Sequence, residues 1–331
     1  MTSTYGPFVK CILGNLRKGK WKDAFIRVVF TLEKIFGAKI KCLLKPLFKE
    51  LGEYDCAIAY RIGICTDFVA YVFNAKNKLT WWHHGSYDYD EKQTKKIEEV
   101  YKAFDYVVSV SEGCKKMLLE HLNIQENKLV VIPNIIDFDA IIEKSQEDID
   151  VDCFDKECVN IVSIGRLSKE KAMVNCIYAC KKLIDDGYKI RWIMIGDGAE
   201  YEFIRDEINK YHLEENVYLL GSKKNPYSYL KRADIFVHTS YVESMSLTVL
   251  EAMCLDKQLV VTKSRGPSEF IKDRENGLLV GDGVDGLVDG VKRLIEDKNL
   301  FERLSCKDES VLEKYTQENV LSEVYKLINK N

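Results

Sequence analysis

Residues 236–253, FVHTSYVESMSLTVLEAM, form the stretch around which the fold of this chain can be interpreted. The apolar run that ends at Val237 is rich in β-branched and aromatic residues and predicts a short buried strand. A polar turn follows. From Leu247 the sequence is typical of the start of a helix, with Ser244 or Ser246 as its N-cap. Strand, turn and helix in this order form the repeating unit of a parallel α/β sheet.

Two acidic residues flank the predicted helix start. Glu243 lies in the turn and Glu251 lies in the helix, eight residues further on. The backbone N–H groups at a helix start have no partner within the helix and can bind an anion. The helix rises about 7–8 Å from Ser246 to Glu251, which is about the span from a diphosphate to the ribose of the same nucleotide. We therefore expect phosphate at the amides of Ser246, Leu247 and Thr248, ribose hydroxyls on Glu251 and a sugar near Glu243.

Two glutamates around a helix start also occur where no ligand binds, so the pattern alone leaves both interpretations open. The stretch resembles the segment S-x-x-E-G-F-G-x-x-x-x-E-A-M of retaining glycosyltransferases of family 4. Ser240, Glu243 and Glu251 match it, as does the Ala-Met pair that follows. The chain departs from it at residues 244–246, Ser-Met-Ser, where the family usually has Gly-Phe-Gly. The backbone amides remain available, so the departure concerns the shape of the loop more than phosphate binding.

A second motif, GRLSKEK at residues 165–171, follows a predicted strand and precedes a helix. Arg166 can bind two phosphate oxygens through its forked guanidinium, and Lys171 can add a point charge. Such cations would stabilise the negative charge that develops on a departing nucleoside diphosphate. A solvated charged loop is the alternative. The resemblance to the family pattern G-R-L-x-x-E-K-G implies that Arg166 and Lys171 bind the diphosphate, with Ala172 in place of the usual glycine.

Two further motifs follow predicted strands. Gly196 and Gly198, in GDG, match the family's G-x-G-P and are expected to line the nucleotide pocket. No third glycine follows, so the motif is not a dinucleotide-binding fingerprint. His83 and His84 stand in WWHHG, where the family has a histidine that faces the donor sugar. The sequence does not decide which of the two fills that role, and a structural role is the alternative. Together with Glu243, this histidine pair is the catalytic set that the resemblance implies.

The domain organisation follows from length and pattern. The chain has 331 residues, enough for two domains, and its net charge of −3 gives no indication of nucleic-acid binding. Strand and helix patterns alternate in both halves, and residues 141–157 are acidic and not periodic. We expect an N-terminal, acceptor-side Rossmann-like domain (1–140), a linker (141–157), a C-terminal nucleotide-sugar domain (158–313) and a C-terminal helix (314–331). Predicted strands lie at 56–60, 79–82, 106–110, 129–132, 159–164, 190–195, 217–220, 235–237, 259–262 and 278–280.

The first fifty residues are strongly basic. They hold eleven Lys and Arg against three acids, a local excess of +8. Their apolar residues recur at helical spacing, which predicts helices with basic faces. An ordinary amphipathic surface helix is one interpretation. Attachment to an anionic membrane surface or to a lipid-linked acceptor is the other. Charges interrupt the apolar stretch 24–40, so it does not predict a membrane span. The eleven cysteines contain no C-x-x-C pair and are interpreted as reduced thiols, which favours a cytoplasmic protein. With the membrane interpretation of the basic residues, it would be peripheral on the inner face of the plasma membrane.

The resemblance extends from about residue 55 to residue 280. It implies the α/β fold class GT-B, in which two Rossmann-like domains face a cleft. It also implies transfer of a hexose from a UDP- or GDP-sugar to a glycan or lipid-linked acceptor with retention, giving an α-linkage. Neither a metal nor another cofactor is expected. The segments 80–85 and 134–142 are most similar to enzymes of bacterial capsule, exopolysaccharide or O-antigen assembly.

One departure bears on activity. Family members usually begin with a strand and a Gly-rich loop, and residues 1–50 show neither pattern, so the N-terminal domain is expected to be incomplete. A degenerate homologue that binds nucleotide without turnover is therefore one alternative. A nucleotide-sugar epimerase of the same fold is another. A nicotinamide dehydrogenase is disfavoured because the chain has no G-x-G-x-x-G motif.

Overall fold

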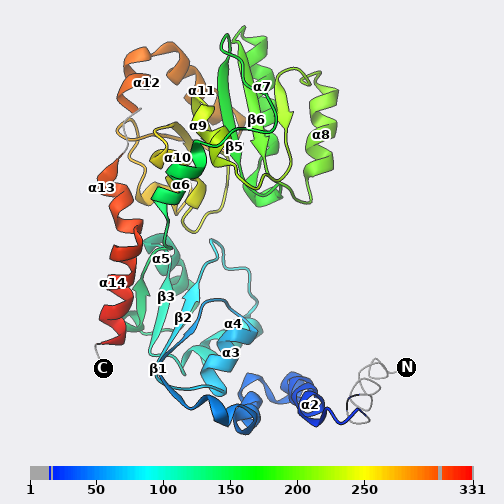
Figure 1. Cartoon of the computed structure of the whole chain (residues 1–331), viewed down its shortest axis with the longest axis vertical. Helices are drawn as coiled ribbons and strands as arrows, with labels where there is room; N and C mark the ends of the chain where they lie inside the picture. The colour runs from blue at the N-terminus through cyan, green and yellow to red at the C-terminus, as the bar shows by residue number, and fades with distance from the viewer. Residues whose placement is uncertain (1–14, 16–17, 305–307, 330–331) are drawn as a thin grey trace.

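The computed structural model describes residues 15, 18–304 and 308–329. Two parallel sheets form two domains stacked along the long axis (Figure 1). The N-terminal sheet has the order β1-β2-β3-β4, and the C-terminal sheet has the order β10-β9-β8-β5-β6-β7. Every paired strand in both sheets is parallel, so all the strands of one sheet end at the same edge.

The N-terminal sheet alternates with helices, as the sequence predicts. Its strands agree with the predicted ones to within a few residues. They are β1 (Glu53–Ala59), β2 (Asn74–Trp82), β3 (Tyr106–Ser109) and β4 (Leu129–Val131). Between them lie α3 (Ile64–Tyr71), α4 (Glu91–Tyr101), α5 (Glu112–His121) and the short 3₁₀ helix η2 (Glu126–Lys128). β1 pairs only with β2 and forms an edge on which Tyr54 and Ile58 are exposed.

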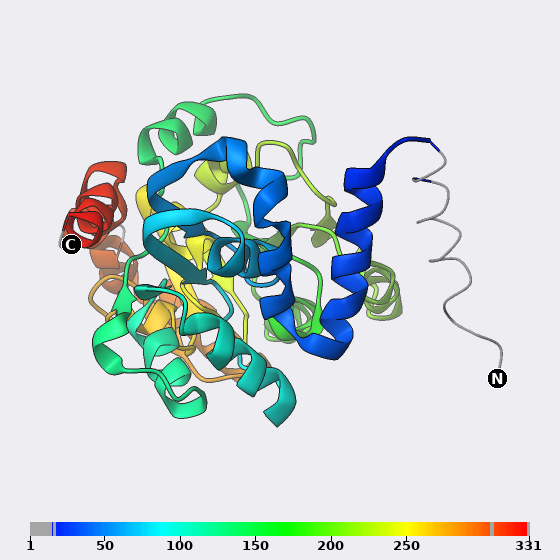
Figure 2. The same cartoon turned by 90° about the horizontal axis from the view of Figure 1, so that it is seen from below.

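The described residues ahead of β1 are mostly helical. They form α2 (Trp21–Phe36) and the 3₁₀ helix η1 (Ala38–Leu51). A buried lysine fixes these helices to the sheet: Lys41 Nζ lies 2.6 Å from Glu33 Oε2 and 2.5 Å from Asp67 Oδ2 of α3. Both views place α2, in dark blue, on the side of the molecule opposite the C-terminal helix, in red (Figures 1 and 2).

The C-terminal sheet carries helices on both faces. Its strands are β5 (Val159–Ile164), β6 (Ile190–Ile195), β7 (Val217–Leu219), β8 (Ile235–His238), β9 (Gln258–Thr262) and β10 (Leu278–Val280). Its longer helices are α7 (Val174–Asp185), α8 (Tyr201–Lys210), α9 (Tyr227–Arg232), α10 (Leu247–Cys254), α11 (Val284–Glu296) and α12 (Lys298–Leu304). The 3₁₀ helices η3 (Lys169–Lys171) and η4 (Pro267–Glu269) lie in loops at the strand ends.

The chain crosses between the domains twice. The first crossing leads into α6 (Phe138–Ser145), which packs on α9 and α10. The first five residues of the predicted linker 141–157 are thus helical and belong to α6. Asp137 caps α6 by accepting from the Ala140 amide at 3.0 Å, and Ile141 is buried. The second crossing runs through α13 (Glu309–Leu312) and η5 (Glu313–Tyr315) to α14 (Gln317–Ile328), which lies along the N-terminal domain (Figure 1).

The two domains share a core and a polar contact. One hydrophobic cluster continues from Trp81 and Val108 in the N-terminal sheet to Met245 and Leu250 of the C-terminal domain. Glu269 also links the domains, because its carboxylate accepts from the amides of Gly113 at 2.5 Å and Glu112 at 3.1 Å at the start of α5. Glu269 follows β9 and α5 follows β3, so this contact places the carboxyl ends of the two sheets next to each other.

Candidate functional site

A pocket of about 330 Å³ opens at the carboxyl ends of β5 and β8. It lies where ligands bind in open parallel sheets, because the loops after neighbouring strands meet there. Asn134 of the N-terminal half contributes to its wall. Six of the residues that the sequence analysis singled out line the pocket: Arg166, Lys171, Glu243, Ser246, Leu247 and Thr248. Five others, namely His83, His84, Gly196, Gly198 and Glu251, lie outside its lining.

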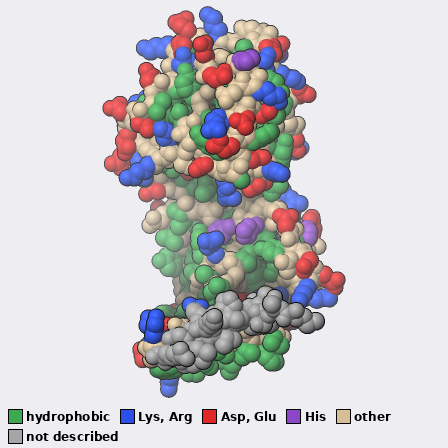
Figure 3. Space-filling model, turned by 90° about the vertical axis from the view of Figure 1, so that its right-hand side faces the viewer, with side chains coloured by type: hydrophobic (Ala, Val, Ile, Leu, Met, Phe, Trp, Pro, Cys, Tyr) green, Lys and Arg blue, Asp and Glu red, His purple; other side chains and the backbone are tan. Residues whose placement is uncertain are grey.

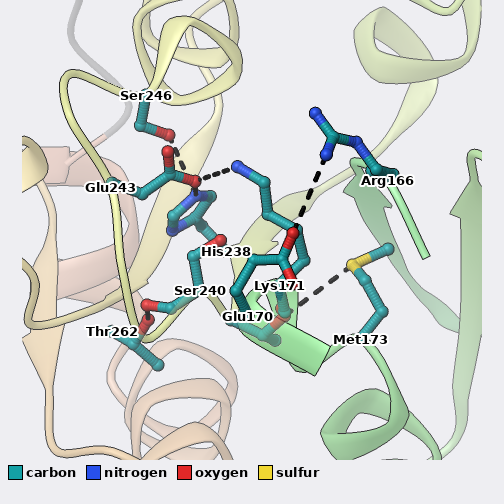
Figure 4. Close-up of polar contacts among 10 residues, drawn as sticks. Arg166, Glu170, Lys171, Met173, His238, Ser240, Glu243, Ser246 and Thr262 are labelled. Atoms are coloured by element: carbon teal, nitrogen blue, oxygen red, sulfur yellow. Dashed lines mark hydrogen bonds and ion pairs between the residues drawn. The ribbon is translucent and has the colours of Figure 1, made fainter. Parts of the chain in front are cut away.

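Glu243 lies at the centre of the polar contacts in this pocket (Figure 4). Its side chain is 8 % exposed, and Oε1 lies 2.5 Å from Lys171 Nζ and 2.9 Å from His238 Nε2. Burial alone would raise the pKa of this carboxyl. The hydrogen bond from His238 and the charge of Lys171 outweigh burial and lower the pKa of Glu243 to about 2. The carboxylate is therefore ionised throughout the physiological range.

Ser246 occupies the N-cap position of α10 but does not cap the helix. Its backbone has φ 64° and ψ 80°, in the left-handed region, and its side chain makes no capping hydrogen bond. Ser246 is therefore the N-cap residue, one of the two that the sequence predicts, but its hydroxyl is turned to His238 Nε2 at 2.9 Å and accepts no amide hydrogen of the first turn. Within the described part of the chain, the amides of Leu247 and Thr248 make no hydrogen bond.

The two cations of the GRLSKEK motif differ in their surroundings. Lys171 is paired with Glu243, and its side chain is 25 % exposed. The Arg166 side chain is 70 % exposed and lies 3.7 Å from Glu170 Oε1. Because this ion pair is long and exposed (Figure 4), the Arg166 guanidinium can exchange it for an anion in the pocket that it lines.

Glu251 of α10 lies outside the lining of this pocket, and its side chain is partly buried. Its Oε1 lies 3.3 Å from the hydroxyl of Tyr227, at the start of α9. Burial raises the pKa of Glu251, and the hydrogen bond from Tyr227 only partly offsets that effect. A partly buried carboxyl with a single neutral partner can accept or donate toward a further polar group. Residues 221–227 follow β7 and are expected to flank the base, but the contact of Tyr227 with Glu251 was not predicted, because no local pattern relates α9 to α10.

Gly196 and Gly198 pack against the Arg166 loop. A Cβ on Gly196 would lie 1.8 Å from the carbonyl oxygen of Gly165, and a Cβ on Gly198 would lie 2.3 Å from that of Leu167. Neither glycine is among the residues that line this pocket, and a contact with the nucleotide stays a prediction. Their lack of a side chain lets the loops after β5 and β6 approach each other, so they act on the position of Arg166.

The histidine pair lies on the N-terminal side of the site. The His83 ring packs on Tyr60 at a centroid distance of 4.6 Å, and burial lowers its pKa. His83 Nε2 is buried and has no partner among the described residues. The His84 side chain is exposed. The residue of this segment that packs against the pocket is Gly85. A Cβ on Gly85 would lie 2.7 Å from the backbone of Glu243.

His238 is the pocket residue that the motif analysis did not identify. It ends β8 and is 5 % exposed. Its position at the carboxyl end of a central parallel strand, five residues before Glu243, is the signal that could have indicated it.

Comparisons with known proteins match both halves of the chain. The family described as "Glycosyl transferases group 1" matches residues 145–310, about half of the chain. The family described as "Glycosyltransferase Family 4" matches residues 48–140.

Two curated relatives illustrate the similarity. An uncharacterised glycosyltransferase of Methanocaldococcus jannaschii is 29% identical over 219 residues, which cover 64% of this chain and 52% of the relative. A Campylobacter jejuni protein is 31% identical over 62% of this chain and 54% of the relative. It is named N-acetylgalactosamine-N,N'-diacetylbacillosaminyl-diphospho-undecaprenol 4-alpha-N-acetylgalactosaminyltransferase. The chain thus spans about half the length of these relatives.

Solved structures share the fold over most of the chain. A glycosyltransferase from Rickettsia africae has a TM-score of 0.74 at 19% identity and covers 89% of this chain and 82% of its own. Anabaena HepE in complex with UDP has a TM-score of 0.70 at 15% identity and covers 93% of this chain and 82% of its own. The expected α/β fold class GT-B is confirmed, and the chain belongs to the group 1 glycosyltransferases.

Proposed function

We propose that this protein transfers a hexose from a UDP- or GDP-sugar to a glycan or lipid-linked acceptor, in the biosynthesis of a surface polysaccharide. The observation that carries the proposal is the pocket at the start of α10. There the unpartnered amides of Leu247 and Thr248 lie with Arg166 and Lys171 around one cavity. Backbone amides and two cations form a site for a diphosphate, the group that leaves in such a transfer.

The proposed chemistry assigns a role to each group. Arg166 and the α10 amides would stabilise the leaving diphosphate, Glu251 would bind the ribose and Glu243 would bind sugar hydroxyls. A double displacement needs a carboxylate nucleophile beside the sugar. Glu243 is the one carboxylate among the described residues that line the pocket, and Lys171 and His238 hold it. We therefore favour retention by attack on the same face, with the departing phosphate as the base and His83 or His84 near the sugar.

Related proteins support the choice of substrates. Anabaena HepE is known in complex with UDP and with UDP-glucose. The name of the Campylobacter jejuni relative specifies an acceptor attached to diphospho-undecaprenol. A capsular polysaccharide glycosyltransferase of Staphylococcus aureus is 23% identical over 67% of this chain. These names favour a nucleotide-sugar donor and a lipid-linked acceptor.

Thermal unfolding of the full chain with UDP, GDP and their sugar conjugates tests this proposal. One nucleotide series should raise the melting temperature, because a ligand present at a hundred times its Kd stabilises the native state by about 2.7 kcal/mol. The shift should persist in EDTA. Glu251→Ala should reduce it by weakening nucleotide binding. Arg166→Ala should mainly lower turnover and leave folding intact, since its side chain is 70 % exposed.

Lys169→Ala is the matched control, because this exposed lysine belongs to the same loop but does not line the pocket. It should behave like the parent in both assays. If no nucleotide shifts the melting temperature of well-folded protein, the proposal is wrong. If both the Glu251 and the Arg166 variants match the parent, the assignment of the site is wrong.

We also propose that the α2–η1 surface, residues 18–51, binds an anionic membrane. None of the helices within the described ranges is both long and apolar enough to span a bilayer. Six of the eighteen exposed large apolar side chains of the described residues lie in residues 21–51, and Figure 3 shows apolar side chains exposed on this domain. Exposed lysines, including Lys39, Lys45 and Lys49, lie among them. Apolar side chains beside basic ones are suited to the boundary between acyl chains and anionic headgroups. The site would then face the cytoplasmic leaflet.

Replacing Lys39, Lys45 and Lys49 with Gln should weaken binding to vesicles that contain phosphatidylglycerol. Each lysine near such a surface contributes about 1 kcal/mol, so the triple variant should bind roughly a hundredfold more weakly in a sedimentation assay. Replacing three exposed C-terminal lysines, Lys263, Lys298 and Lys314, is the charge-matched control. Equal binding by the two triple variants would show that overall charge, and not this surface, determines the affinity.

A further inference from the structure

His238 connects the two ends of the turn between β8 and α10. A single ring nitrogen, Nε2, lies 2.9 Å from Glu243 Oε1 and 2.9 Å from Ser246 Oγ. A carboxylate only accepts hydrogen bonds, so Nε2 must carry the hydrogen that faces Glu243. The other nitrogen, Nδ1, is buried and has no partner in the described part of the chain. All the polar contacts of this imidazole are therefore directed at the pocket.

The contact with Ser246 affects the amides of α10. A serine at an N-cap usually has an extended backbone and accepts from an amide of the first turn. Ser246 instead has φ 64°, a left-handed conformation that is strained for a residue with a Cβ. The hydrogen bond with His238 offsets part of that strain and holds the hydroxyl away from the helix. As a result, the amides of Leu247 and Thr248 stay open toward the pocket.

The contact with Glu243 fixes the other end of the turn. His238 and Lys171 both lie at Oε1, and no described residue forms a hydrogen bond with Oε2. Two partners on one oxygen orient the carboxylate and leave the second oxygen for an incoming hydroxyl. If His238 were removed, the buried carboxylate would keep a single partner and could rotate.

We infer that His238 is a positioning residue of the donor site. It acts through Glu243 and Ser246, and it holds the β8–α10 turn in the conformation that exposes the α10 amides to a diphosphate. This inference rests on the proposed function. It also predicts a coupling between His238 and Ser246 that can be measured in the protein without any ligand.

The test is a double-mutant cycle of His238→Leu and Ser246→Gly in the full chain, with UDP and GDP as probes. His238→Leu should weaken binding of the preferred nucleotide at least tenfold, because Ser246 then adopts an extended backbone and caps α10. Adding Ser246→Gly should recover most of that loss, since glycine tolerates the left-handed conformation and has no hydroxyl to cap the helix. His238→Gln keeps an N–H donor and should bind more tightly than His238→Leu.

Urea unfolding of the same four proteins without nucleotide separates this inference from the proposed function. The effects of the two substitutions on the free energy of unfolding should be non-additive, as expected for residues in direct contact. Additive effects, or nucleotide binding by His238→Leu that matches the parent, would overturn the role of His238. If the parent binds no nucleotide, the proposed function fails, and the unfolding cycle still decides the inference.

Discussion

Lys171→Met should lower the free energy of unfolding at pH 7 by about 2–4 kcal/mol, because it removes a cation from a buried carboxylate. Lys171 Nζ lies 2.5 Å from Glu243 Oε1, and the Glu243 side chain is only 8 % exposed. This loss of stability should lie at or slightly below the range that is usual when one partner of a buried ion pair is removed, because the Lys171 side chain is 25 % exposed. If the proposed transfer is correct, turnover should also fall by about a hundredfold or more, through weaker stabilisation of the leaving group.

The pH dependence gives this prediction a second readout. The pKa of Glu243 is about 2 in the folded protein, against an ordinary value of 4.5. Ionised Glu243 therefore stabilises the parent above pH 4.5, and this contribution is lost as the pH falls from 4.5 toward 2. Without Lys171 the pKa of Glu243 should rise and lie closer to its ordinary value of 4.5, so the stability of the variant should fall less between pH 4.5 and 2 than that of the parent.

Urea unfolding at a series of pH values between 3 and 7 measures both effects. The matched control is Lys95→Met, which breaks an ion pair of similar length, 2.6 Å from Glu91, whose side chains are 71 % and 85 % exposed. Such surface pairs contribute about 0–1 kcal/mol. If Lys171→Met and Lys95→Met lost the same stability at pH 7, the buried pair would not stabilise the pocket.

The sequence predicted the sheet better than the helices. The strands of the C-terminal sheet match the predicted ones to within a residue or so, because apolar β-branched runs are a local signal. The second half of α6, residues 141–145, lies in a segment that we predicted as a linker. α6 is short and acidic, and it is stabilised by the Asp137 cap and by burial of Ile141, neither of which shows as a periodic pattern.

The sequence predicted those parts of the candidate site that follow from the parallel order of the strands. Arg166 and Glu243 follow strands of the same sheet, so their meeting at one edge follows from parallel topology. That Lys171 and His238 share one oxygen of Glu243 depends on how two loops pack, and sequence spacing does not contain that information. The role of Gly196 likewise depends on a neighbouring loop, because its close contact is with a carbonyl thirty-one residues earlier.

Gly196→Ala should lower the free energy of unfolding by about 3 kcal/mol or more, the range of severe overpacking. The added Cβ would lie 1.8 Å from the carbonyl oxygen of Gly165, and the backbone of Gly196 has φ 151°. The neighbouring atom belongs to the backbone and not to a flexible side chain, so the loop after β5 must move. That movement should displace Arg166 and weaken nucleotide binding as well.

Gly165→Ala is the matched control on the opposing loop, because a Cβ there would meet nothing within 4 Å. In urea unfolding without nucleotide it should lie within about 1 kcal/mol of the parent. A Gly196→Ala protein as stable as Gly165→Ala would mean that the two loops can separate without cost. The glycines after β6 would then have no part in holding Arg166 at the pocket, and the loss of nucleotide binding expected in Gly196→Ala should also be absent.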